Sequence, residues 1–354
     1  MTYRAKEGAA LDSMVRQART VCRQAEREQP RRGRGRRPTI PDWVLALMIM
    51  VAVMRRKKTK SAQYTFWTRH RREFRRWMPA HRLPARSTFF ERYRRVHSLF
   101  EQAIRLQGLH AIERGWADPT CVAADKSLVA GCGPNWSPRD RRRGHIPKGV
   151  DTDTTWGYSE HDGWVQGYAY EVIVTASKGG AIWPLLASAD TASRSEQKSV
   201  LPKLPYLPKQ TRFVLADAGY DSNQVAEVVE WQDPHRRTGR RFLCPAVPRP
   251  NDGRGQPARQ SRERRWHRER RDRRRKYFQS AAGQRLYTRR KVTVEPFNAH
   301  VKHLFELEDR VWHRGLDNNR TLLLAAVFAY QVLLAYNHRR DCPAMHLQEI
   351  LDAL

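Results

Sequence analysis

The spacing of apolar residues predicts helices at both ends of the chain and a mixture of strands and helices between them. The segments expected to form helices, from the period of their apolar positions, are 41–54, 61–77, 87–107, 196–204, 222–231 and 320–336. Short apolar or alternating runs typical of strands are 121–129, 164–175, 181–187, 212–216 and 241–247. Several strands followed by alternating helices and strands indicate a mixed α/β sheet flanked by helices.

The stretch 285–306 combines an apolar stripe with a row of charges. The stripe, at steps of three and four, consists of Val294, Phe297, Val301 and Leu304. Glu295, Asn298 and Lys302 lie on another face. Pro296 predicts that the helix begins here, because proline is tolerated in the first helical turn but not deeper. A carboxylate close to the basic residues 289–291 suits a site that holds a metal and a phosphate, although a solvated surface helix gives the same pattern.

Two earlier aspartates belong to apolar, strand-like runs. Asp125 lies in 121–129 and Asp217 follows 212–216, so we expect both at or near strand ends, projecting from a sheet edge. Hard divalent cations prefer oxygen ligands, and two Mg²⁺ ions about 3.5–4 Å apart can assist an in-line phosphoryl displacement. Asp125, Asp217 and Glu295, from three separate elements, would supply such a site.

Three motifs within residues 122–339 resemble the DDE transposases of bacterial insertion sequences, which share an RNase H-like catalytic fold. Two of the motifs are Ala-Asp125-Lys and Ala-Asp217-Ala-Gly-Tyr-Asp221. The third runs from Tyr287 to Lys302 and is similar to the tyrosine-arginine-glutamate-lysine signature of one large branch of these enzymes. The seven-residue step from glutamate to lysine matches that signature.

The third motif departs from the strictest form of the signature at its basic end. Tyr287 and Arg290 lie one residue further from Glu295 than that form has them, and Lys291 occupies its arginine position. The resemblance therefore assigns Glu295 and Lys302 more firmly than the individual roles of the other three residues.

The resemblance implies a transposase with a carboxylate-bound metal centre. Asp125, Asp217 and Glu295 would hold two Mg²⁺ ions, which Mn²⁺ could replace, to hydrolyse phosphodiester bonds at transposon ends and transfer the freed 3′-hydroxyl into target DNA. The residues implied to hold phosphates near the scissile bond are Tyr287, Arg290, Lys291 and Lys302. The implied partners are double-stranded DNA, as terminal repeats and as target, and a second copy of the chain in a dimer on DNA.

Charge agrees with a nucleic-acid partner. Lys and Arg number 67 against 36 Asp and Glu, a net charge of +31, and such an excess favours a polyanion. The five cysteines show no Cys-x-x-Cys pairing, which is typical of a reducing cytosol. The longest apolar runs fall short of the about 20 residues that a membrane helix needs. We therefore expect a cytoplasmic, nucleoid-associated protein with no membrane partner.

Composition divides the chain into four parts. We expect a basic flexible leader at 1–37, a helical DNA-binding region at 38–117, a catalytic domain at 118–338 and a C-terminal tail at 339–354. An arginine-rich insertion, 248–282, lies between the second and third carboxylates. The predicted fold class is thus a mixed-sheet α/β, RNase H-like domain with a helical N-terminal region and this insertion.

Two basic segments each have two interpretations. Arg92, Arg94 and Arg95 lie in a helix that could enter the major groove of DNA, or whose aromatic residues pack inward while its arginines are solvated. Trp266, in the insertion, could stack on an exposed base at a DNA end, but we favour the interpretation that it anchors the insertion to the domain.

Two rival functions stay open. A metal-dependent nuclease of the same fold, without strand transfer, would need the same three acids. A catalytically inactive, transposase-derived repressor would keep the basic helices but should have lost an acid, whereas all three acids are present here.

Overall fold

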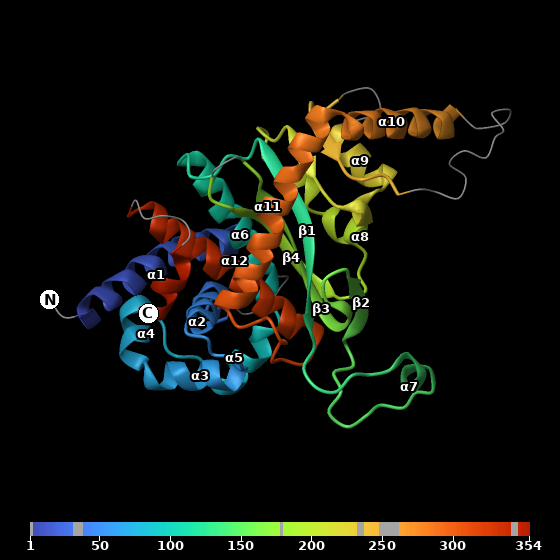
Figure 1. Ribbon diagram of the computed structural model, residues 1–354. Helices are drawn as coiled ribbons and strands as arrows, with labels where there is room; N and C mark the ends of the chain where they lie inside the picture. Colours follow the sequence, from blue (N-terminus) through green and yellow to red (C-terminus); the bar gives the residue numbers. More distant parts are fainter. Residues whose placement is uncertain (1–2, 31–37, 178–179, 232–236, 248–261, 341–345) are drawn as a thin grey trace.

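The structure is a computed structural model that describes residues 3–30, 38–177, 180–231, 237–247, 262–340 and 346–354 (Figure 1). Its helices are α1 (Tyr3–Glu28), α2 (Asp42–Met54), α3 (Lys60–Arg69), α4 (Arg71–Trp77), α5 (Arg86–Tyr93), α6 (His97–Glu113), α7 (Pro138–Arg142), α8 (Glu196–Val200), α9 (Asn223–Glu230), α10 (Arg262–Gln279), α11 (Ala281–Leu304), α12 (Leu316–His338) and α13 (Leu347–Asp352). Its strands are β1 (Cys121–Ala130), β2 (Thr155–Ser159), β3 (Gly163–Thr175), β4 (Pro184–Thr191), β5 (Phe213–Leu215) and β6 (Arg241–Leu243). Two short 3₁₀ turns are η1 (Leu204–Tyr206) and η2 (Ala218–Tyr220).

The strands form one mixed sheet. Its order is β2-β3-β1-β5-β6, with β4 also paired to β3. The pairs β1–β3, β2–β3 and β3–β4 are antiparallel, whereas β5 runs parallel to both β1 and β6. This arrangement confirms the predicted α/β class and is consistent with an RNase H-like domain.

Helix α12 lies at the centre of the hydrophobic core. It packs against α2, α6, β3 and β4, and in Figure 1 it lies between the N-terminal helices and the sheet. It is longer than the predicted run 320–336 and, by length and composition, could cross a membrane, but 94% of its apolar window is buried inside the protein. The burial shows that its apolar residues serve the core.

Helix α1 corrects the prediction of a flexible leader. Its residues Leu11, Met14, Val15 and Ala18 are buried at helical spacing, and the helix packs against α2, α6 and α12. The polar composition of this segment favoured a flexible leader, whereas its apolar stripe is what packs into the core. The basic tract 31–37 lies outside the described residues.

Several predicted elements differ in their bounds. The predicted helix 61–77 is two helices, α3 and α4, which meet at His70, and the predicted helix 87–107 is likewise divided into α5 and α6. Strand β4 begins at Pro184, three residues later than predicted. Of the predicted insertion, the described part is helical and the segment 248–261 lies outside the described residues.

The prediction that a helix begins at Pro296 is wrong. Helix α11 begins at Ala281, where the Ser280 hydroxyl accepts a hydrogen bond from the Gly283 amide at 3.1 Å. Pro296 lies inside the helix, where it leaves the Val292 carbonyl without its usual helical partner. Both residues are exposed, with Val292 68% accessible, so water can replace the lost hydrogen bond.

Candidate active site

The parallel pairing of β1 and β5 brings Asp125 and Asp217 together. Ala123 lies opposite Leu215, and each aspartate follows its strand partner by two residues. Side chains two residues apart on a strand share a face, so the two carboxylates point to the same side of the sheet. Asp125 lies in the middle of β1, not near its end as predicted, but the β1–β5 pairing stops at Ala123 and leaves the carboxylate at an open edge.

Helix α11, which runs beside β1 (Figure 1), contributes two side chains to this pair. Arg290 Nη2 donates to Asp125 Oδ1 at 2.5 Å and to Asp217 Oδ2 at 3.4 Å. Asn298 Nδ2 donates to the other oxygen of Asp125 at 2.7 Å. A single guanidinium therefore bridges the two aspartates, and both oxygens of Asp125 are engaged.

Electrostatics make this pair attractive to a cation. Burial raises the pKa of Asp125 to about 6, which Arg290 opposes and Asp217 reinforces. Burial also raises the pKa of Asp217, which Arg290 again opposes. Burial works against the charge of Arg290, but the two aspartates outweigh it and raise the pKa of the guanidinium. Two desolvated carboxylates at one point require positive charge, and Arg290 supplies it here.

Glu295 is exposed on α11, three residues before Asn298. Its charge reaches the site, because it contributes to the raised pKa of Asp125. Within the described ranges, however, no group of three or more His, Cys, Asp or Glu residues is close enough to hold a metal ion. The structure thus brings together two of the three predicted carboxylates, and the role of Glu295 stays a prediction.

Two features of this sheet edge suit a divalent cation, the carboxylate pair and the amide of Asn298. Asp125 and Asp217 offer the oxygen ligands that Mg²⁺ prefers, and the Arg290 guanidinium stands in for the positive charge that an ion would bring. Asn298 Oδ1 is buried and has no hydrogen-bond partner among the described residues. The aspartates would hold the ion, and the Asn298 amide is a further oxygen donor beside it.

The remaining predicted phosphate-binding residues of α11 lie at different depths. Lys302 is partly buried, with Nζ 3.9 Å from Asp162 Oδ2, and burial lowers its pKa against the attraction of Asp162 and Asp125. Tyr287 is partly buried, and burial raises its pKa to about 12 against the attraction of Arg290. Lys291 is exposed. The phosphate contacts of all three stay predictions.

A carboxylate missed by the sequence analysis, Glu196, lies beside Asp217. A Cβ added to Gly219 would lie 2.6 Å from Glu196 Oε2 and 3.2 Å from Asp217 Oδ1, so both acids approach the same glycine and any side chain there would displace them. Glu196 is 3.6 Å from Lys126 Nζ, and its negative charge adds to the raised pKa of Asp217.

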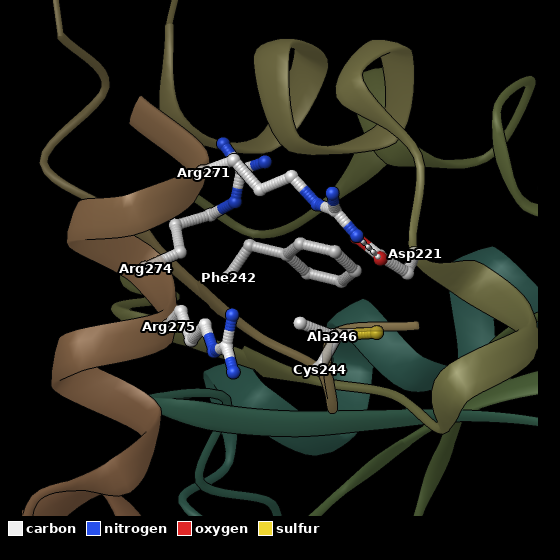
Figure 2. A pocket seen from close by; sticks show the side chains of 7 residues that line it. All are labelled: Asp221, Phe242, Cys244, Ala246, Arg271, Arg274 and Arg275. Atoms are coloured by element: carbon white, nitrogen blue, oxygen red, sulfur yellow. Dashed lines mark hydrogen bonds and ion pairs between the residues drawn. The ribbon is translucent and has the colours of Figure 1, made fainter. Parts of the chain in front are cut away.

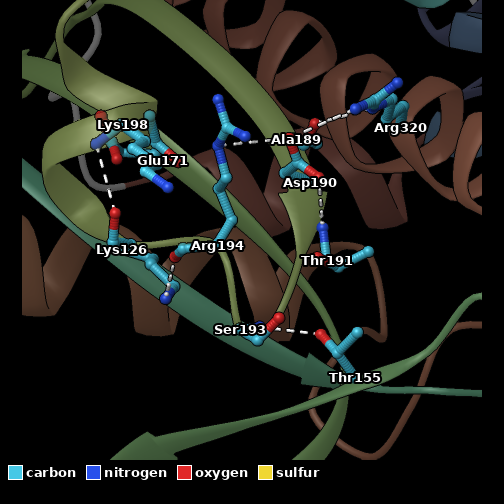
Figure 3. A network of polar contacts seen from close by, with 12 residues as sticks. Lys126, Thr155, Glu171, Ala189, Asp190, Thr191, Ser193, Arg194, Lys198 and Arg320 are labelled. Carbon is cyan, nitrogen blue, oxygen red and sulfur yellow. Dashed lines mark hydrogen bonds and ion pairs between the residues drawn. The ribbon is translucent and has the colours of Figure 1, made fainter.

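Polar contacts next to β1 hold this region in place (Figure 3). Lys126 Nζ donates to the backbone oxygen of Arg194 at 2.8 Å. Asp190, on β4, is 3.9 Å from the Arg194 side chain and 3.2 Å from Arg320 of α12. These contacts join β1, β4 and α12, and so fix the segment that leads into Glu196.

The sequence held a signal for one of the two missed residues. Asn298 lies on the polar face of α11 that also carries Glu295 and Lys302, so its position alone indicated the site. Glu196 reaches Asp217 because α8 packs against η2, a contact between distant segments that no local pattern reveals.

Arg92, expected either to contact DNA or to be solvated, is instead engaged inside the protein. Its side chain is 10% exposed, forms an ion pair with Asp42 and donates to the Ile40 carbonyl. Phe89 and Tyr93 are fully buried, which confirms the inward packing of the aromatic face. Arg94 and Arg95 are exposed, and their contact with DNA stays a prediction.

Trp266 packs against the domain. Its ring centroid lies 6.0 Å from that of Trp231, and the Arg270 guanidinium lies against both indoles. This contact supports the interpretation that Trp266 anchors α10, because the indole is partly covered by protein. Stacking on a base stays untested.

Comparison with protein-family models matches residues 116–332 to the transposase DDE domain. No curated protein and no solved structure matches the chain. The matched range holds the strands, both converging aspartates, Arg290 and Glu295, although it does not identify the branch with the Tyr-Arg-Glu-Lys signature. Since the match spans more than half of the 354 residues, this chain belongs to the DDE-domain transposases.

Proposed function

We propose that this transposase hydrolyses a phosphodiester bond at each transposon end and joins the freed 3′-hydroxyl to target DNA. The observation that carries the proposal is the convergence of Asp125 and Asp217 on one positive group, Arg290. Two negative side chains that point to the same cation form the core of a site for divalent ions, Mg²⁺ or Mn²⁺.

The side chains divide the work as follows. Asp125 and Asp217 hold metal, with Glu295 as the third carboxylate. When bound, the ions supply activation of the attacking oxygen and stabilisation of the leaving oxygen. Arg290, which pairs with both aspartates in this structure, would bind a phosphate oxygen of the DNA together with Lys302, and Tyr287 and Lys291 would contact the same DNA strand.

Both chemical steps exchange one bond to phosphorus for another. In cleavage, the oxygen of water forms the new bond to phosphorus and the 3′-oxygen of the transposon end leaves as a hydroxyl. In strand transfer, that 3′-oxygen attacks a target phosphate, and the 3′-oxygen of the target strand leaves. No protein atom forms a covalent intermediate.

The partners follow from this chemistry and from the charge. A net charge of +31 supports binding to double-stranded DNA, both the terminal repeats and the target, in the cytoplasm and its nucleoid. Because two ends must be joined to one target, we propose a dimer in the DNA complex.

Glu295→Gln tests the assignment of the third carboxylate. The variant should lose metal-dependent cleavage of terminal-repeat DNA while keeping nearly wild-type DNA affinity, because the change removes one metal ligand and no positive charge. Glu113→Gln, at an exposed position on α6, is the matched control and should cleave normally. Cleavage by Glu295→Gln at the wild-type rate would remove Glu295 from the site.

A nuclease without strand transfer is the second candidate, because it would use the same acids. A substrate that already carries a free 3′-hydroxyl at its end separates the two functions. Joining of this end to a target plasmid supports the transposase, whereas hydrolysis without joining supports the nuclease.

A further inference from the structure

A small basic pocket lies between α10 and the segment that follows β6 (Figure 2). Arg271, Arg274 and Arg275 line it from one face of α10, since residues three and four apart on a helix are neighbours. The opposite wall consists of Asp221, Phe242, Cys244 and Ala246. Figure 2 shows Arg271 reaching Asp221 and Arg275 extending toward Cys244 and Ala246, with the Arg274 side chain lying along the helix beside Arg271.

The one carboxylate among the described residues that line the pocket is already engaged. Asp221 Oδ2 accepts from Arg271 Nη2 at 3.0 Å and from the Val247 amide at 2.9 Å, and Arg271 also donates to the Val247 carbonyl. Both side chains of this pair are largely buried, with 11% and 7% exposed. The pair therefore fastens α10 to the domain.

Arg274 is left with a donor that needs an acceptor. Its Nη2 is buried and has no hydrogen-bond partner in the described part of the chain. Burial lowers the pKa of Arg274, and Glu230 and Asp221 oppose this effect. A buried charged donor without an acceptor is costly. Arg275, one residue further on, is exposed, so the pocket presents a covered and an accessible guanidinium side by side.

The pocket adjoins the catalytic pair. Cys244 Sγ donates to the backbone oxygen of Asp217 at 2.9 Å, and Asp221 follows Asp217 by four residues. A ligand held by Arg274 and Arg275 would therefore lie next to the strand end that presents Asp217.

The lining selects an anion. Three guanidiniums against one carboxylate repel metal ions, and burial raises the pKa of the Cys244 thiol, so it is not a ready nucleophile. The cavity measures about 10 Å³, the size of a single water-sized group. It therefore admits one oxygen of a larger ligand whose remaining atoms stay outside.

We propose that Arg274 and Arg275 bind one backbone phosphate of the DNA beside Asp217, by taking a phosphate oxygen into this pocket, with the Arg271–Asp221 pair as its support. Planar guanidiniums suit phosphate oxygens through paired hydrogen bonds. The inference rests on the proposed function and specifies which part of the DNA is held next to the catalytic pair.

DNA affinity measured without metal tests the pocket. Fluorescence anisotropy with a fluorescein-labelled duplex of arbitrary sequence, in EDTA over a series of salt concentrations, compares wild type, Arg274→Gln, Arg275→Gln and Arg268→Gln. Arg268 is exposed on the same helix and gives the same loss of charge. We expect Arg274→Gln to weaken binding by about tenfold and to lower the salt slope by about one phosphate, with a clearly smaller effect of Arg268→Gln.

Two further measurements separate the pocket from a structural role. Arg274→Gln should unfold at or above the wild-type temperature, because it removes a buried donor without an acceptor. The exposed Arg275→Gln should weaken binding in the same direction with unchanged stability. Equal losses of DNA affinity in Arg274→Gln and Arg268→Gln would show that α10 binds DNA only as a diffuse basic surface. That result would contradict the phosphate-binding role of the pocket.

The outcome is independent of the catalytic proposal. A wild-type protein that cleaves DNA but shows no special dependence on Arg274 overturns the pocket alone. A wild-type protein whose binding depends on Arg274, but which cleaves nothing with any divalent metal, leaves the phosphate pocket intact and overturns the catalytic proposal.

Discussion

Arg290 supplies to the two aspartates the positive charge that a bound metal ion would otherwise supply. Its Nη2 contacts both Asp125 and Asp217, and its charge opposes the rise in pKa that burial imposes on each of them. Metal binding must therefore replace an existing ion pair. The same side chain is then available to a phosphate, so the exchange would couple metal binding to DNA binding.

Replacing Arg290 tests this competition. Arg290→Gln should bind Mn²⁺ more tightly than wild type, by roughly 10-fold or more, since a hydrogen bond to a charged group is worth about 1.5–3 kcal/mol. Cleavage should nevertheless fall, because the phosphate loses its guanidinium. Titration calorimetry measures the affinity, and Lys291→Gln, which removes an exposed charge on the same turn, is the control. Weaker Mn²⁺ binding by Arg290→Gln would contradict the competition.

The raised pKa of Asp125 also predicts how stability depends on pH. Its folded-state pKa of about 6 exceeds the value near 3.9 of an unfolded chain, so the folded protein binds the proton more tightly. Asp125 should therefore favour folding below about pH 4, and this contribution should be lost as the pH rises to about 6. Urea unfolding in EDTA should show wild type losing stability relative to Asp125→Asn across this window. If wild type instead gained stability relative to Asp125→Asn as the pH rises, the attraction of Arg290 for the ionised Asp125 would outweigh the effect of burial on its pKa.

Among elements, α11 does the most to build the site, and its continuity was the least predictable feature. The sequence located its apolar stripe and the polar face with Glu295, Asn298 and Lys302. Pro296 suggested a helix start because proline inside a helix removes a backbone hydrogen bond. That rule takes no account of whether water can replace the bond. The exposure of Pro296 and Val292 makes an interior proline tolerable here, and exposure is set by tertiary packing.

Removing the proline measures this tolerance. Pro296→Ala should stabilise the protein by about 1–3 kcal/mol, because alanine restores the hydrogen bond to Val292 and a proline in a helix interior costs about 3 kcal/mol. Denaturant unfolding gives the difference. Pro138→Ala is the matched control, since Pro138 lies at the start of α7, where proline costs little. A destabilised Pro296→Ala would show that α11 depends on the conformation that proline imposes.

The sheet illustrates what local patterns can and cannot provide. The strand-like runs around Asp125 and Asp217 were visible in the sequence, and so was the mixed order of strands and helices. The parallel register that sets Ala123 opposite Leu215 joins segments about 90 positions apart. No local sequence pattern predicts such a pairing. The proximity of the two acids could be expected from a resemblance, but their register came from the structure.

At the scale of the whole molecule, the N-terminal helices and the catalytic sheet share one hydrophobic core. Buried residues from Leu11 on α1 to Leu351 on α13 belong to the same cluster. Composition along the chain suggested a leader, a DNA-binding region and a catalytic domain as separate parts. Net charge indicates the kind of molecule that a protein binds, but it does not locate the boundary between two hydrophobic cores.

The division at 37 and 117 therefore stays a prediction about roles. Arg94 and Arg95 can still contact DNA from the turn that follows α5, while the buried Arg92–Asp42 pair joins α5 to α2. DNA bound across these helices and the site would contact a single continuous body, which fits a net charge of +31 spread over the chain.

Divalent-metal-dependent nicking of a duplex that ends in the element's own terminal repeat, by wild type and by Asp217→Asn, is a direct test of the metal–carboxylate mechanism. We expect nicking by wild type with Mg²⁺ or Mn²⁺, none in EDTA, and none by Asp217→Asn, although both proteins bind the duplex. Nicking by Asp217→Asn, or tight binding without nicking by wild type, would contradict the proposed metal–carboxylate mechanism.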